Sequence, residues 1–356
     1  MAGYPSVEGE RRVSPARLHA AVADVFGRCG MSPEDAARLT DSLVASDLRG
    51  VHSHGVLRVP EYVKKLRVDG VNPRGVPRIE RDAGAALVVD GDNSMGQIGA
   101  AFAMRAAIER ARTTGLAAAA VRGSNHCGAM AYYAMMALEA GMIGLATTNA
   151  LPTMAAWGGL DKIVGINPLG IAIPSGTEPP LVFDAAFSGS AHGKIRVYAQ
   201  KGLPIPEGWA FDAAGHPTAD AVAALAGLLQ PIGGFKGTGL AIMFGVLSSV
   251  LSGAAYGTEL GNMVDGPTSG QDGHFFLAVN VAAFTEFPAF RQRVDAVVRE
   301  IRGSRRAPGV ERVYSPGEIE QETEARYRAE GIPLATATLD DLIATAGLVG
   351  AAIGDL

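Results

Sequence analysis

Residues 116–147, LAAAAVRGSNHCGAMAYYAMMALEAGMIGLAT, join two short apolar runs through a polar segment and a helical pattern. Short apolar runs bounded by glycine are typical of buried strands, and Ala85–Val89 forms a third run of the same kind. Helical patterns at Ile98–Arg112 and Ala129–Ala140 lie between these runs. Periodicity therefore predicts an α/β protein in which strands and helices alternate.

Both ends of the chain carry helical patterns without strands. Ser14-Pro15 and Ser32-Pro33 are typical helix starts, because serine caps free N–H groups and proline fits the first turn. Apolar residues at helical spacing follow both starts, and they recur at Phe290–Ile301 and near Leu339. The sequence therefore predicts helices at both termini, around a strand-rich middle.

Two further apolar runs, Ile171–Ile173 and Leu181–Phe183, are separated by glycine and proline signals. The connection between them is too short for a crossover helix, which parallel strands require. At least part of the sheet is therefore predicted to be antiparallel.

Glycine is abundant, with 46 residues, yet no GxGxxG stands between a strand and a helix. The phosphate-binding fingerprint of the Rossmann fold is therefore absent. The densest glycine motif is GGFKGTG, residues 233–239, which also lacks the Walker A spacing. Its backbone N–H groups and Lys236 are suited to a phosphate, although a simple cluster of turn glycines is an equal alternative.

The charge balance limits the classes of partner. A formal net charge of -5 gives no attraction for nucleic acid or anionic lipid, and the tightest basic groups are predicted to be solvated helix ends. These groups are Lys64, Lys65 and Arg67, and Arg302, Arg305 and Arg306.

The sequence also predicts a cytoplasmic location. The charged N-terminus lacks a secretory apolar region, and the two cysteines are too few for a disulfide framework. The longest apolar segment, Leu240–Leu251, is shorter than the roughly 20 residues of a membrane span, so it is predicted to be a buried helix.

One segment, DLRGVHSHGVLR at residues 47–58, combines histidine and arginine. If residues 54–58 are helical, His54 and Arg58 share one face, which places an acid/base group next to a carboxylate clamp. A capping serine with solvated imidazoles is an equally good interpretation, and His52 with His54 also has the spacing of a metal-ligand pair.

Two other polar positions follow predicted strands. Ser124, Asn125 and His126 precede a helix start and are well placed to contact a ligand; a plain helix cap is the alternative. Asp184 follows another apolar run and has strand termination as its simplest role. The remaining candidate histidines, His192, His216 and His274, are predicted to lie at the surface or in turns.

Taken together and in order, these motifs resemble those of the type-2 malate/L-lactate dehydrogenase family, from about Val13 to Val349. This non-Rossmann, NAD(P)-dependent group includes ureidoglycolate, sulfolactate and diketogulonate dehydrogenases and piperideine-2-carboxylate reductases. The segments that carry the resemblance are DLRGVHSHGVLR, SNHCGAMAYYAMMALEAGMIGLATTNALP, WGG, GINPLGIAIP, FDAAFSGSAHGKI, IPEGWAFD, GGFKGTGLAIMF, GHFFLAVN and SPGEIE.

The resemblance implies a mixed α/β fold in which a largely antiparallel sheet packs against a helical domain built from both chain ends. Residues 1–80 plus 310–356 would form the helical substrate and dimerisation domain. Residues 81–309 would form the NAD(P)-binding domain with inserted helical segments. It also implies a homodimer.

By the same resemblance, the activity is hydride transfer between NAD(P)H and a small 2-oxo acid or cyclic 2-imino acid. His54 would be the acid/base, with Ser53 and Asp184 in a relay to it. Arg58 and Arg49 would bind the substrate carboxylate. His126 would lie near the substrate and nicotinamide, where some members of the family give it the acid/base role.

The resemblance does not decide between NAD and NADP as the cofactor. The sequence also departs from the family pattern at several positions. Cys127 replaces the usual Phe, Ile166 a Thr, Ala185 a Met and His192 an Arg. The residues implied to surround the dinucleotide are His126, Asn149, Asp184, Ala185, Ala186, Lys236, Gly237, Pro316, Gly317 and Glu318.

A second function class, a metal-dependent hydrolase, is also compatible with the chemistry-bearing residues. Its ligands would be His52, His54, His126 and Asp184, because imidazole and carboxylate are common ligands of zinc. The dehydrogenase interpretation requires no metal ligands. The spatial arrangement of these four side chains separates the two hypotheses.

Overall fold

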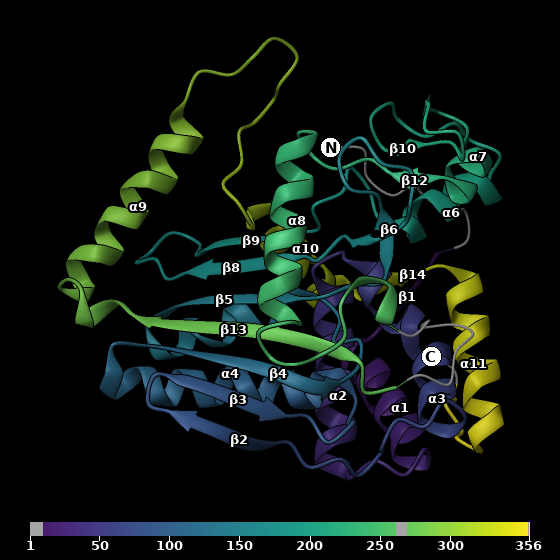
Figure 1. The fold of residues 1–356 in the computed structure, drawn as a ribbon, viewed down its shortest axis with the longest axis horizontal. Helices are drawn as coiled ribbons and strands as arrows, with labels where there is room; N and C mark the ends of the chain where they lie inside the picture. Colours follow the sequence, from purple (N-terminus) through teal and green to yellow (C-terminus); the bar gives the residue numbers. More distant parts are fainter. Residues whose placement is uncertain (1–9, 261–268, 355) are drawn as a thin grey trace.

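The computed structural model describes residues 10–260, 269–354 and 356. Its centre is a seven-stranded sheet with the order β2-β3-β4-β13-β5-β8-β9 (Figure 1). All neighbouring pairs are antiparallel except β3 and β4. The strands are β2 (Arg78–Ala83), β3 (Ala86–Asp90), β4 (Leu116–Ser124), β5 (Met142–Thr148), β8 (Leu169–Ile173), β9 (Leu181–Ala185) and β13 (Asp272–Asn280).

The predicted mixed α/β fold with a largely antiparallel sheet is confirmed, and the topology departs from simple alternation at β13. This strand comes late in the chain but inserts between β4 and β5, pairing antiparallel with both. Local periodicity carries no information about such a distant partner. The predicted hairpin is present as the antiparallel pair β8 and β9.

Helices α4 (Gly96–Thr114) and α5 (Met130–Met136) pack against one face of the sheet, and α8 (Phe235–Ser248) crosses the other (Figure 1). The first face is rich in alanine, in both α4 and β4, which brings the helix close to the strands. At the start of α4, a Cβ on Gly96 would lie 1.9 Å from the carbonyl oxygen of Asn125. Only glycine therefore lets this helix approach the segment that carries His126.

The two chain ends form one helical layer with a shared hydrophobic core. The antiparallel pair β1 (Arg11–Val13) and β14 (Ile332–Leu334) ties the ends together. The helices of this layer are α1 (Pro15–Arg28), α2 (Pro33–Leu48), α3 (Val59–Arg67), α10 (Glu318–Glu330) and α11 (Thr336–Val349). The layer agrees with a helical unit drawn from both termini, while its exact boundaries at residues 80 and 310 stay a prediction.

A smaller subdomain packs around a third core. It contains the helices α6 (His192–Gln200) and α7 (Ala221–Ala226), the three-stranded sheet β10 (Ala210–Phe211), β11 (Pro217–Thr218) and β12 (Leu228–Leu229), and the pair β6 (Pro152–Met154) and β7 (Val164–Gly165). On the side of the sheet far from this subdomain, α9 (Phe287–Gly303) and the loop after it project away from the sheet (Figure 1).

Two predictions about burial are wrong. Lys65 is not at a solvated helix end: it is 5% exposed, on the inner face of α3. The apolar segment Leu240–Leu251 is not buried throughout, because α8 turns its small residues to the sheet and leaves large ones exposed, including Met243 at 63%. Hydrophobicity alone does not tell which side of an apolar helix meets the core. Within the described residues, no helix has the length and apolarity needed to cross a bilayer.

Candidate active site

The segment that carries His54 is two short 3-10 turns, His52–His54 and Val56–Arg58, joined at Gly55. The buried carboxylate of Asp47, near the end of α2, holds both turns: it accepts hydrogen bonds from the N–H of Val56 and bonds Nδ1 of His52, each at 2.8 Å. A Cβ on Gly55 would lie 2.0 Å from this carboxylate. The loop conformation therefore depends on glycine at 55 and a carboxylate at 47.

His54 is held at one ring nitrogen by its neighbour in sequence. The hydroxyl oxygen of Ser53 lies 2.9 Å from Nδ1 of His54. Burial, together with the positive charge of Arg58, lowers the pKa of His54 to about 4. The imidazole is therefore neutral at pH 7, with one nitrogen engaged by Ser53.

His126 lies in the loop between β4 and α5, and its ring stacks on that of His54 with 5.9 Å between centroids. The hydroxyl of Tyr62, on α3, lies 2.6 Å from Nδ1 of His126 and accepts a hydrogen bond from Nε2 of Gln97. Burial raises the pKa of Tyr62, so its hydroxyl keeps a proton to donate. Burial, with the charge of Arg58 next, lowers the pKa of His126.

The tautomer of His126 follows from the direction of its bond to Tyr62. A hydroxyl has one donor and two acceptor positions, so with Gln97 at one acceptor position it can either donate to Nδ1 or accept from it. Where Tyr62 donates, the neutral ring carries its proton on Nε2, and that nitrogen is a hydrogen-bond donor. Sequence analysis missed Tyr62, although it lies eight residues after His54 in a helix that begins at the same segment.

A cavity of about 320 Å³ opens beside Ser53 and His54, and neither His126 nor Arg58 is among the residues that line it. Ser53 and His54 form part of its wall from one side, and Asp184 at the end of β9 forms part from the other. Most of the remaining lining is apolar, including Met130, and Ile166 at a position where the chain departs from the family pattern. Such a pocket excludes water from a few polar groups, as ligand sites do.

Asp184 lines the same cavity as Ser53 and His54, but its recorded hydrogen bonds run elsewhere. Its carboxylate accepts from the N–H of Ala131 at 2.7 Å, at the start of α5, and also bonds the N–H of Met130. Burial raises the pKa of Asp184 to about 6. The proposed relay from Asp184 through Ser53 to His54 stays a prediction.

The two predicted clamp arginines approach the site from different helices. Arg58 donates to the carbonyl of Ser53 and to the carboxylate of Glu61, both at 2.8 Å. Arg49 lines the cavity and reaches Glu324 on α10 at 3.5 Å. Both guanidinium groups keep N–H donors that these bonds do not use, since each has five.

The residues expected around the dinucleotide fall into three groups. Ala185 and Ala186 line the cavity beside Asp184. Asn149 is buried and bonds the backbone of Ala255 and Gly273. The other expected residues lie outside the cavity: Lys236 and Gly237 in the first turn of α8, and Pro316, Gly317 and Glu318 at the start of α10. Their contacts with a dinucleotide stay predictions.

The mostly apolar wall of the cavity can pack against a ring, and its few polar groups can bond the polar part of the same ligand. The hydroxyl oxygen of Ser190, on its wall, is buried and has no hydrogen-bond partner in the described part of the chain. Buried hydroxyls are usually paired, so a free one that faces a cavity is suited to a bound ribose or amide group. These features are compatible with a nicotinamide dinucleotide.

The hydrolase alternative finds no support in the geometry. In residues 10–260 and 269–354, no three or more His, Cys, Asp and Glu side chains are grouped as metal ligands. His52 instead bonds Asp47, and Asp184 caps α5.

His274 is not the surface or turn histidine expected from sequence. It is fully buried in β13 between the hydroxyls of Ser124 and Thr148, at 2.7 Å each, and Cys127 contacts it at 3.5 Å. The strand's insertion into the middle of the sheet buries this side chain, which no local pattern indicates.

Comparisons with known proteins agree with this fold. Residues 13–343 match the family model described as malate/L-lactate dehydrogenase. Malate dehydrogenase of Pyrococcus abyssi is 38% identical over 95% of both chains. The sulfolactate dehydrogenase structure of Methanocaldococcus jannaschii has a TM-score of 0.90 at 34% identity, covering 96% of this chain and 98% of that one.

A reductase from the same set of structures widens the range of substrates among relatives. The Δ1-piperideine-2-carboxylate reductase of Pseudomonas syringae pvar. tomato has a TM-score of 0.84 at 31% identity, covering 94% of this chain and all of that one. The matches in sequence and in structure both cover nearly the whole chain, and both give the same family. The protein belongs to the malate/L-lactate dehydrogenase family.

Proposed function

We propose that His54 is the acid/base of a hydride transfer between NAD(P)H and a small 2-oxo acid or cyclic 2-imino acid. The observation that carries the proposal is a half-buried, neutral imidazole on the wall of the cavity, with Ser53 at its Nδ1. The dehydrogenase names of the relatives support the class of reaction.

In the oxidative direction, Nε2 of His54 takes the proton of the substrate hydroxyl while the hydrogen on C2 leaves as a hydride. The bound nicotinamide supplies the hydride acceptor. The hydroxyl carbon thereby becomes a carbonyl, and the imidazole becomes an imidazolium that Ser53 stabilises at Nδ1. In the reductive direction, the same nitrogen returns the proton to the carbonyl oxygen or imine nitrogen.

The substrate carboxylate can tune this histidine as it binds. Burial is the main cause of the lowered pKa of His54, and the positive charge of Arg58 is the second. A carboxylate bound at Arg58 offsets that positive charge. Binding of the acid therefore raises the pKa of His54 and favours its protonated form for reduction. His126, with its proton on Nε2, donates a hydrogen bond to the same substrate oxygen and orients it.

The test is oxidation of NADH and NADPH with pyruvate, oxaloacetate, sulfopyruvate, 2,3-diketogulonate and piperideine-2-carboxylate. We expect turnover with at least one pair, and a loss in kcat of about 10²- to 10⁴-fold in His54→Ala, with dinucleotide affinity unchanged. His216→Ala is the control, because that side chain is 79% exposed. Unchanged kcat in His54→Ala would transfer the role to His126.

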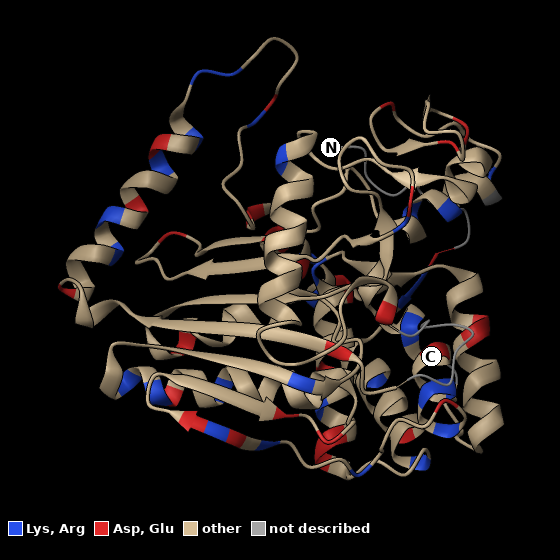
Figure 2. Ribbon diagram, viewed as in Figure 1, with Lys and Arg blue, Asp and Glu red and all other residues tan. Residues whose placement is uncertain are grey.

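We also propose that the protein is a homodimer that joins through α8, and not through the terminal helices to which the resemblance assigned dimerisation. The residues of α8 that contact the sheet are small, including Gly237, Ala241 and Gly245, whereas Leu240 and Met243 on the other side are large, apolar and exposed. Figure 2 shows no charge along the helix beyond Lys236 at its start. A solvated helix has the opposite pattern, so this face is suited to a second copy of itself.

A cytoplasmic location is the last part of the proposal. Cys29 and Cys127 are both free and buried, which suits a compartment where disulfides are rare. Cell fractionation followed by immunoblotting tests it, and recovery of the protein in the secreted fraction would contradict it.

A further inference from the structure

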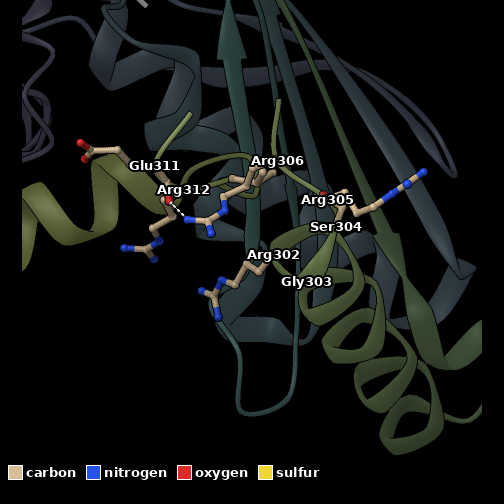
Figure 3. Close-up of a pocket in the computed structure, with 8 residues that line it drawn as sticks. Arg302, Gly303, Ser304, Arg305, Arg306, Glu311 and Arg312 are labelled. Atoms are coloured by element: carbon tan, nitrogen blue, oxygen red, sulfur yellow. Dashed lines mark hydrogen bonds between the residues drawn. The ribbon is translucent and has the colours of Figure 1, made fainter. Parts of the chain in front are cut away.

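A second cavity, of about 640 Å³, lies where α9 ends and the projecting loop begins (Figure 3). As predicted, Arg305 and Arg306 are exposed at the end of α9, and with Arg302 and Arg312 they line this hollow. The rest of the lining is Gly303, Ser304, Glu311 and Val313. Three of these arginines, Arg302, Arg306 and Arg312, lie on one side of the loop, which indicates a site for an anion.

Glu318 holds two of these arginines in place. Its buried carboxylate accepts a hydrogen bond from Nε of Arg302 at 3.0 Å, pairs with Arg312, and accepts from the N–H and hydroxyl of Ser315 at 2.9 Å each. Burial opposes its ionisation, yet the bonds from Arg302 and Ser315 outweigh this and lower the pKa of Glu318 to about 2. The carboxylate is therefore ionised and fully engaged.

Of Arg302, Arg306 and Arg312, Arg306 alone has no described carboxylate partner: Arg302 pairs with Glu178 and Glu318, and Arg312 pairs with Glu318 and Glu322. The one recorded bond of Arg306 goes to the carbonyl of Glu311 at 2.6 Å. In Figure 3 the guanidinium groups of Arg302, Arg306 and Arg312 gather on one side of the loop, whereas Arg305 points to the other side. The carboxylate of Glu311 points away from Arg302 and Arg306.

The turn of residues 316–320 connects this cavity with the active site. The carbonyl of Pro316 accepts a hydrogen bond from the N–H of Val182 at 3.0 Å, and both Val182 and Glu320 line the active-site cavity. Glu318 lies two residues after Pro316 and two before Glu320, and its side chain bonds the arginines instead of the active-site cavity. A ligand that crosses this turn reaches both cavities, as a dinucleotide does with its reactive ring at one end and its adenosine at the other.

The two dinucleotides differ at one group, the ribose 2′ position. NAD sites commonly use a carboxylate to bind the ribose hydroxyl, and NADP sites use arginine for the 2′-phosphate. Glu318 has no free lone pair directed to a ribose, because Arg302, Arg312 and Ser315 engage it. Arg302 also pairs with Glu178 at 2.6 Å and Arg312 with Glu322 at 2.7 Å, so these two arginines offer a phosphate dianion only their remaining N–H donors, and Arg306 offers the charge that no described carboxylate offsets.

We propose that Arg302, Arg306 and Arg312 bind the 2′-phosphate of NADP, which makes NADPH the preferred cofactor of this protein. The inference rests on the proposed hydride transfer and gives its cofactor. Arg302 and Arg312 are oriented by Glu318, and Arg306 supplies the charge that no carboxylate offsets.

Calorimetric titration of the whole protein with adenosine 2′,5′-bisphosphate and with adenosine 5′-monophosphate tests the site without catalysis. We expect the bisphosphate to bind at least tenfold more tightly, a difference of about 1.4 kcal/mol. Arg306→Gln should remove most of that preference. Arg305→Gln, which removes the same charge from the neighbouring residue, should leave it intact because that side chain points away.

Equal affinity for the two nucleotides, or equal losses in the two variants, would overturn the site. Inorganic phosphate that binds as tightly as the bisphosphate would also overturn it, because the pocket would then hold any phosphate and not the cofactor. Titration with NADH and NADPH separates this inference from the proposed function. Tighter or equal binding of NADH in an active enzyme contradicts only the inference, whereas binding of neither dinucleotide contradicts both.

Discussion

At the scale of single residues, the environment of His54 makes its protonation a measurable property. Burial and Arg58 hold its pKa at about 4 in the free protein, below the usual 6.5. A base is active when deprotonated, so kcat/KM for oxidation of the 2-hydroxy acid should be level from pH 8 down to about pH 5. It should fall about tenfold per pH unit below about pH 4. An inflection near pH 6.5 in the measured profile would show that His54 is solvated.

Tyr62 is the second residue whose role can be isolated. It acts through His126, because its hydroxyl fixes which ring nitrogen carries the proton. Tyr62→Phe should lower kcat by about ten- to a hundredfold, the usual cost of leaving a buried hydrogen-bonding group unpaired, with little effect on KM for the dinucleotide. Tyr198→Phe, on α6, is the matched control. Equal kcat in the two variants, measured by stopped-flow hydride transfer, would remove Tyr62 from the site.

At the scale of elements, Gly55 decides whether the two 3-10 turns can form. A Cβ there would overlap the Asp47 carboxylate, which holds both His52 and Val56. Gly55→Ala should therefore destabilise the protein by about 1–3 kcal/mol, as overpacking does, and lower activity beyond that loss of stability. Gly27→Ala in α1 is the control, because no atom lies within 4 Å of its Cβ. Thermal unfolding that ranks the two variants equally would contradict this account.

At the scale of the whole molecule, the sequence predicts what is local and misses what is distant. The strands and helices around residues 86–148 follow from periodicity, and the alternation of α4 with β4 is visible in the sequence. The insertion of β13 between β4 and β5 is invisible to periodicity, and so is the burial of His274 that results from it. Only the resemblance to a family supplied a largely antiparallel topology.

In the candidate site too, the local features were predictable from sequence and the distant contacts were not. The local segments predicted to carry chemistry, around His54 and His126, meet in the fold with 5.9 Å between their ring centroids. Tyr62 and Asp47 were missed because their roles depend on contacts that form only after folding. The arginines just after α9 are exposed as predicted, but charge spacing alone does not show that they line a hollow together with Arg312.

The exposed apolar face of α8 carries the last prediction, which concerns assembly. Leu240, Met243 and Val246 are exposed at three-residue spacing along α8, and burying them against the same face of a second copy would remove apolar surface from water. Met243→Glu places a charge at the middle of that contact. We expect sedimentation velocity to show a dimer for the unmodified protein and a shift to monomer for Met243→Glu.

Val222→Glu is the control for assembly. This residue is 67% exposed on α7, in the smaller subdomain and away from α8, so the dimer should persist in that variant. Dissociation in both variants would indicate a general loss of stability, and circular dichroism of each distinguishes that case. A protein that sediments as a monomer before any substitution would show that α8 has another partner, because so many large apolar side chains along one helix are rarely left in water.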